Sequence, residues 1–167
     1  VMLPRMSNLA AKGKAEESRR YIYNSIVFAM FLAFAMMFGI AGIAEDFVPV
    51  FLGEEYFPCV LLIRVMSPTV LFIAWANVIR TQYLIPNHED RSYIISVLLG
   101  AVVNLIINMI LIPHFNAMGA VIGTVCAEGS VCICQTLMVR KKLDIWCYVK
   151  ETAPFLVIGS VMILAIL

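Results

Sequence analysis

Charged residues are scarce in this sequence: Asp, Glu, Lys and Arg together make up 14% of 167 residues, and the formal net charge is only +1. Soluble domains carry about 25% charged residues. A chain with so few cannot cover its whole surface with groups that favour water. The near-neutral balance by itself argues neither for nor against binding of nucleic acid. The sequence shows no other sign of such a partner, and we expect none.

Motifs of soluble enzymes are missing. The chain contains no GxxxxGK(S/T) loop, no GxSxG turn, no HExxH helix and no CxxC pair. Its two histidines, His88 and His114, are far apart and fall in expected turns, which is typical of exposed side chains. Three of the five cysteines lie in one apolar segment, where they act as small hydrophobic residues. We therefore expect no metal site, no cofactor and no enzymatic activity.

Long hydrophobic runs are abundant instead. Hydrophobic residues make up 62% of the chain, against about 45–50% in soluble domains. Several runs reach the roughly 20 residues that a helix needs to cross a bilayer. The sequence therefore predicts an all-α, polytopic transmembrane helix bundle. Pro68 should kink the second span of this bundle. The expected spans are about 21–44, 59–84, 93–112 and 117–139, with a partial span at 153–167.

Each end of the chain is expected to contain only part of a membrane span. Val1 to Leu3 resemble the end of an earlier helix, and the run 153–167 is shorter than a full span. We interpret residues 1–167 as one fragment of a larger transmembrane bundle.

Positive charge alternates along the chain. All Lys and Arg residues except Arg64 lie in or beside three segments, and the two loops between them contain none. Cytoplasmic loops carry the excess of Lys and Arg, so we expect the basic segments in the cytoplasm. These are 4–20, 85–92 and 140–152, whereas the loops 45–58 and 113–116 should be external, the first with an apolar patch at the membrane interface.

Glu128 is an acidic residue expected about 16 Å deep in the fourth span. A charged residue there costs about 3 kcal/mol on insertion scales. Thr124 and Gln135 share its helical face. Two interpretations remain open: a cavity carboxylate that binds a cation or cargo, or a structural carboxyl that is protonated or hydrogen-bonded between helices.

Asn104 and Asn108 share a face of the third span. They can line a cavity or form interhelical hydrogen bonds. Gly119, Gly123 and Ala127 form a row of small residues on another side of the fourth span from Glu128, which favours close helix packing.

Arg64 is the basic residue placed well inside a span. It can extend to the outer interface or face a cavity and meet an anion such as a phosphate. Asn77 is a weaker cavity candidate. Arg64 and Glu128 differ in depth by roughly 8 Å, so we predict no direct salt bridge between them.

Three motifs occur in order: QYLIP closing the second span, NxxxNxxLIP closing the third, and GAxxGTxxAE in the fourth. With VMLPRMSNL at the start and FLGEEY after the first span, they resemble the late part of bacterial polysaccharide flippases. Those proteins belong to the multidrug/oligosaccharidyl-lipid/polysaccharide exporter superfamily. Asn116 departs from the pattern, because the family often has Gly there.

The resemblance implies that the chain is part of the C-terminal half of a protein with two six-helix bundles. It implies a transporter that flips a polyprenyl-diphosphate-linked oligosaccharide across the bacterial cytoplasmic (inner) membrane by alternating access, commonly coupled to H+ or Na+. Its expected partners are membrane lipid, this cargo and the missing N-terminal bundle. Arg64 would suit the diphosphate, and Glu128 matches the acid that ends GAxxGTxxAE.

Two alternatives remain open. A cation-coupled multidrug exporter of the same superfamily shares the expected architecture. An integral-membrane polysaccharide polymerase, ligase or acyltransferase usually needs a large outer loop or clusters of His, Arg and Asp. The short outer loops of this chain make the enzymes the weaker alternative.

Overall fold

The computed structural model describes residues 2–166, and this part of the chain is helical with no strand, so the all-α prediction is confirmed. Val1 and Leu167, the outermost residues of the two expected partial spans, lie outside the described residues. The elements are α1 (Met2–Ala11), α2 (Ala15–Phe51), the short turn η1 (Glu54–Tyr56), α3 (Cys59–Met66), α4 (Thr69–Ile79), the π-helical turn η2 (Arg80–Leu84), α5 (Asp90–Phe115), α6 (Ala117–Val139) and α7 (Ile145–Ile166).

Four helical stretches in the described residues are long and apolar enough to cross a membrane, as predicted. They are Glu16–Phe51, Cys59–Leu84, Asp90–Phe115 and Ala117–Val139. Large apolar side chains on them are exposed, for example Leu105 at 62% and Met109 at 70%. Water would oppose such a surface and hydrocarbon favours it. The chain is therefore a multi-pass membrane protein.

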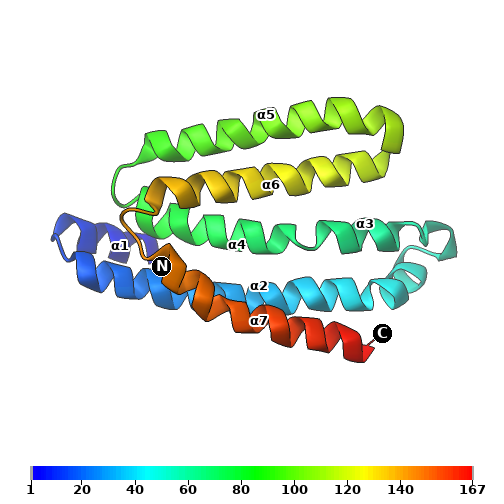
Figure 1. Cartoon of the computed structure of the whole chain (residues 1–167), viewed down its shortest axis with the longest axis horizontal. Coiled ribbons are helices and arrows are strands. Elements are labelled where there is room, and N and C mark those ends of the chain that lie inside the picture. Colours follow the sequence, from blue (N-terminus) through cyan, green and yellow to red (C-terminus); the bar gives the residue numbers. More distant parts are fainter. Residues whose placement is uncertain (1, 167) are drawn as a thin grey trace.

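The long helices lie side by side in one row (Figure 1). α5 packs on α6, α6 on α3 and α4, α4 on α2, and α2 on α7. The main buried cluster is built mostly from α1, the first half of α2, α4 and the α6–α7 connection. It lies toward the end of the bundle, along the helix axes, that carries α1, the η2–α5 turn and the α6–α7 loop, which we call the basic end.

The first span is longer than expected. Residues 47–51, predicted to form an interfacial patch outside the helix, continue α2 to Phe51. Packing explains the difference, because Ala44 and Val48 are fully buried and form a small cluster with Val60 of α3. The helix also begins earlier, at Ala15, and α1 covers most of the remaining basic segment 4–20.

The predicted kink at Pro68 interrupts the helical hydrogen bonding between α3 and α4, although Ser67 and Pro68 keep right-handed helical dihedral angles. The hydroxyl of Ser67 donates to the carbonyl of Arg64 at 2.9 Å, and that of Thr69 donates to the carbonyl of Met66 at 2.7 Å. These bonds satisfy carbonyls that the broken helix would leave free. The second span therefore crosses as two short helices followed by a π-helical turn.

α5 and α6 form the closest helix pair. A β-carbon built on Gly119 would meet the carbonyl carbon and oxygen of Leu111 at 2.6 Å, and one on Gly123 would meet Asn108 Oδ1 at 2.1 Å. At position 119 only glycine permits this approach of the two backbones, whereas position 123 contacts a side chain. Asn116 makes the tight turn between the helices with φ 49° and ψ −124°, a conformation that glycine adopts without strain.

Candidate functional site: a polar groove between α4, α5 and α6

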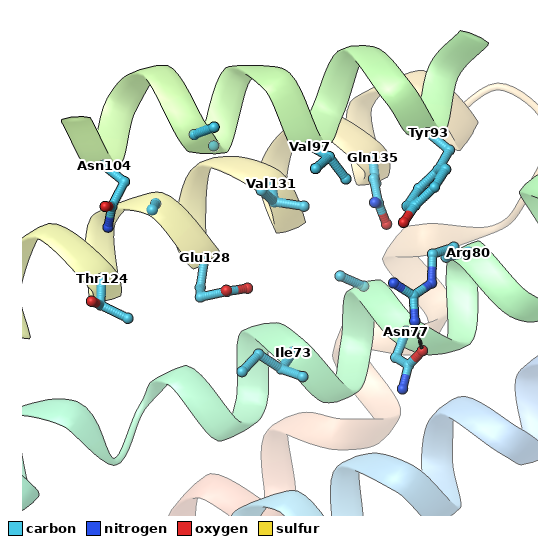
Figure 2. A pocket seen from close by; sticks show the side chains of 14 residues that line it. Ile73, Asn77, Arg80, Tyr93, Val97, Asn104, Thr124, Glu128, Val131 and Gln135 are labelled. Atoms are coloured by element: carbon cyan, nitrogen blue, oxygen red, sulfur yellow. Dashed lines mark hydrogen bonds between the residues drawn. The ribbon is translucent and has the colours of Figure 1, made fainter. Parts of the chain in front are cut away.

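A groove of about 450 Å³ lies between the α4–η2 segment, α5 and α6 (Figure 2). Its apolar walls include Ile73, Val97 and Val131. Its polar lining comes from three of the membrane-crossing stretches: Asn77, Arg80, Tyr93, Asn104, Thr124, Glu128 and Gln135. A small set of convergent polar groups in an apolar cleft is typical of a ligand site.

Arg80 supplies the positive charge of this groove. Its Nη2 atom donates to Asn77 Oδ1 at 2.6 Å, and its guanidinium lies 5.5 Å from the centroid of the Tyr93 ring. The residue begins η2, where the change from α- to π-helical geometry turns the following side chains. These two contacts hold the guanidinium beside the groove (Figure 2).

Glu128 supplies the negative charge. Its side chain extends from α6 into the open space between the helices (Figure 2). It takes part in none of the ion pairs or side-chain hydrogen bonds found among residues 2–166. The neighbouring Thr124 hydroxyl is used by its own helix, donating to the carbonyl of Ala120 at 3.0 Å. The carboxylate oxygens of Glu128 therefore remain available to a ligand.

One side-chain hydrogen bond connects α6 to α5 near the groove, and a second one lies within α5. Gln135 Nε2 donates to Ser96 Oγ at 3.0 Å, and Asn108 Nδ2 donates to Asn104 Oδ1 at 2.9 Å. Gln135 Oε1 and Asn108 Oδ1 are buried without a hydrogen-bond partner within the part of the chain that the structure describes. Buried acceptors of this kind usually find a partner. Gln135 lines the groove, so its oxygen can accept from water or from a ligand donor there.

The structure brings together Asn77, Asn104, Glu128 and Gln135, which were all cavity candidates from the sequence. Asn108 lies behind the groove, in the contact with Gly123. Of the small-residue row, Gly119 and Gly123 face α5, and Ala127 also borders the groove.

Arg64 lies outside the groove. Its Nη2 atom pairs with Glu45 Oε2 at 2.8 Å, and its Nε atom donates to the carbonyl of Ala41 at 3.1 Å. The guanidinium thus joins α3 to α2, toward the end of the bundle opposite the basic end. No direct contact with Glu128 is found, in line with their different depths.

Sequence analysis missed Arg80 and Tyr93 as groove residues. Arg80 was counted with the basic turn that follows the second span, although it lies three residues after Asn77 on the same helical face. That spacing was the available signal. Tyr93 offered no comparable signal, because its position depends on how α5 packs beside η2.

The groove has the chemistry of a binding site. It presents one guanidinium, one carboxylate and several amides, with Glu128 two helical turns from Gln135, or about 10 Å. Within residues 2–166, no group of three or more His, Cys, Asp or Glu side chains could hold a metal ion.

Fold and groove together define a class: a multi-pass helical membrane protein with a charged groove between its spans. A search of curated proteins finds similarity to the "Probable low-salt glycan biosynthesis flippase Agl15" of Haloferax volcanii, at 26% identity over 134 residues. The match covers 74% of this chain and only 26% of that relative, so the chain spans about a quarter of the relative's length. No protein-family model matches the chain, and no solved structure matches it.

Proposed function

We propose that this chain is part of the C-terminal half of a transporter that flips a polyprenyl-diphosphate-linked oligosaccharide across the cytoplasmic membrane by alternating access. The observation that carries the proposal is the groove, where Arg80 and Glu128 face a shared space inside membrane-crossing helices. Ionisable groups at such positions usually mark a transport pathway. The similarity to a protein named as a glycan biosynthesis flippase supports the same conclusion.

Each charged residue has a distinct role in the proposal. Arg80 contacts a phosphate of the cargo, because a guanidinium binds phosphate oxygens in a bidentate way. The amides of Asn77, Asn104 and Gln135 bind sugar hydroxyls. Glu128 takes up the coupling cation, H+ or Na+, as its unpaired carboxylate allows. An N-terminal bundle of the same protein closes the other side of the groove.

Orientation follows from the charge pattern. We place the basic segments 4–20, 85–92 and 140–152 in the cytoplasm of a bacterial cell, as the positive-inside rule requires. A topology reporter fused after Glu55 should be read outside the cytoplasm. A cytoplasmic reading would reverse the whole arrangement.

The function is tested by complementation of a strain that lacks the gene, with surface glycan as the measured product. Arg80→Gln should reduce glycan export about tenfold or more, because a charge-assisted phosphate contact contributes about 1.5–3 kcal/mol. Glu128→Gln should remove the dependence of export on the coupling ion gradient. Each variant must also appear in the membrane at the level of the unchanged protein.

Arg64→Gln is the matched control, since it removes the same charge from the same interrupted span but outside the groove. We expect nearly normal export from this variant. The sequence-based interpretation, in which Arg64 faces the cavity, leads to the opposite result. Loss of export with Arg64→Gln and normal export with Arg80→Gln would refute the assignment of this groove.

A cation-coupled multidrug exporter is the second candidate. The unpaired carboxylate of Glu128 favours it, because a carboxylate in a groove between membrane helices suits a cationic drug as well as a coupling ion. Unchanged surface glycan in the deletion strain, together with increased sensitivity to cationic drugs, would select this alternative.

A further inference from the structure

A second cavity, of about 370 Å³, lies at the basic end of the bundle and is separate from the groove. Four segments that are far apart in the sequence line it: the α1–α2 turn, the first turns of α2, the η2–α5 turn and the α6–α7 loop. Arg19 comes from α2, and Lys141 and Lys142 come from the loop. The fold thus brings together three cations that the sequence distributes over two basic segments.

The charge of this cavity is only partly balanced. Lys142 pairs with Glu89, and the hydrogen bond to that carboxylate raises the pKa of Lys142 above its usual value. Neither Arg19 nor Lys141 takes part in any ion pair found within residues 2–166. No Asp or Glu is among the residues that line the cavity. The cavity is therefore positively charged overall.

The lining also has the right polar and apolar parts for a lipid headgroup. Ser18 contributes a hydroxyl and Tyr83 contributes a phenol. The positive charges of Lys142 and Arg19 both act electrostatically on this phenol. Beneath them, Ile22 and Leu143 are at most 3% exposed and form an apolar floor. The donors match the phosphate of a lipid headgroup, and the buried apolar residues close the cavity on the side of the bundle core.

The cavity also lies at the level of the membrane surface. Tyr83 is within one residue of the end of the second membrane-crossing stretch, and Lys141 follows the end of α6 by two residues. Basic pockets between membrane helices at this level bind phosphate-bearing headgroups. A free phosphate would use the same donors but would not be held at this level by hydrocarbon chains in the membrane.

We propose that this cavity binds the phosphate group of an anionic lipid in the leaflet at the basic end of the bundle. The lipid phosphate accepts hydrogen bonds from Arg19 and Lys141 and ties the start of α2 to the α6–α7 loop. This site is distinct from the cargo groove and does not depend on the transport proposal.

Native mass spectrometry of the full-length protein in detergent micelles tests the proposal, with phosphatidylglycerol or phosphatidylcholine added in increasing amounts. The double variant Arg19→Gln/Lys141→Gln should weaken retention of phosphatidylglycerol about thirtyfold, since each cation near the surface contributes about 1 kcal/mol. Phosphatidylcholine retention should change little. Lys141→Gln alone, at an exposed loop position, should give about a fivefold loss and covers the case in which the double variant folds poorly.

The chain offers a matched control. Arg20→Gln/Arg140→Gln removes the same two charges from the immediately neighbouring, exposed positions, neither of which lines the cavity. Retention of phosphatidylglycerol by this control should be nearly unchanged. An equal loss in both double variants would overturn the proposal, because it would show diffuse attraction to surface charge. Complete displacement of phosphatidylglycerol by millimolar inorganic phosphate would also overturn it in favour of a soluble phosphate.

Discussion

Three glycine-to-alanine substitutions test how closely α5 and α6 approach. Each substitution adds one methyl group and the same gain in helix propensity, about 1 kcal/mol. They differ in what the new β-carbon meets. At Gly119 it meets the backbone of Leu111 at 2.6 Å, at Gly123 it meets Asn108 Oδ1 at 2.1 Å, and at Gly39 of α2 nothing lies within 4 Å.

The magnitudes follow from these contacts. For Gly119→Ala the two helices must separate by about 0.8 Å to reach the shortest ordinary contact of 3.4 Å. Overpacking of this kind costs about 1–3 kcal/mol, and about 1 kcal/mol is returned by helix propensity. The net loss of stability should therefore be about 1 kcal/mol. Gly123→Ala should lose less, because the Asn108 side chain can turn away. Gly39→Ala should gain about 1 kcal/mol from helix propensity alone.

Unfolding by SDS in mixed micelles measures these differences. Trp75 is a suitable fluorescent probe, because it is buried and its indole Nε1 donates to Thr136 Oγ1 of α6 at 2.9 Å. The exposed Trp146 can be replaced by Phe in every variant to remove its signal. If Gly119→Ala proved as stable as Gly39→Ala, the close α5–α6 contact, and the groove beside it, would be wrong.

Two further predictions concern the connections between helices. Asn116→Gly should stabilise the protein by about 1 kcal/mol, and Asn116→Ala should not, since residue 116 has a positive φ that glycine adopts freely; the same SDS titration measures both. The hydrogen bond to Glu89 raises the pKa of Lys142 above its ordinary value of 10.5. The stability that this pair contributes is therefore fully present below pH 10.5 and is lost as the pH rises through the raised pKa of Lys142. Lys142→Gln should therefore be less stable than the unchanged protein near neutral pH and approach it in alkaline buffer, and a constant difference across that range would contradict the pairing.

Part of the candidate site could be predicted from the sequence. Glu128 and Gln135 are polar residues at helical spacing inside an apolar run. Any rotation of the helix that turns such residues toward lipid is costly in free energy. They therefore had to face the protein interior, and both line the groove. Arg64 and Arg80 could not be separated in this way, because each lies near one end of the same interrupted span and a long side chain there can reach several environments.

The sequence by itself determined the number of crossings, the alternation of basic connections with connections that lack Lys and Arg, and the position of the kink at Pro68. These are properties of single segments, set by hydrophobicity and backbone chemistry. Only the tertiary structure decided that Arg80 lines the same groove as Glu128, whereas Arg64 pairs with Glu45. It also decided that two basic segments meet around a second cavity. Those outcomes depend on the rotation of each helix about its axis, which packing against its neighbours sets.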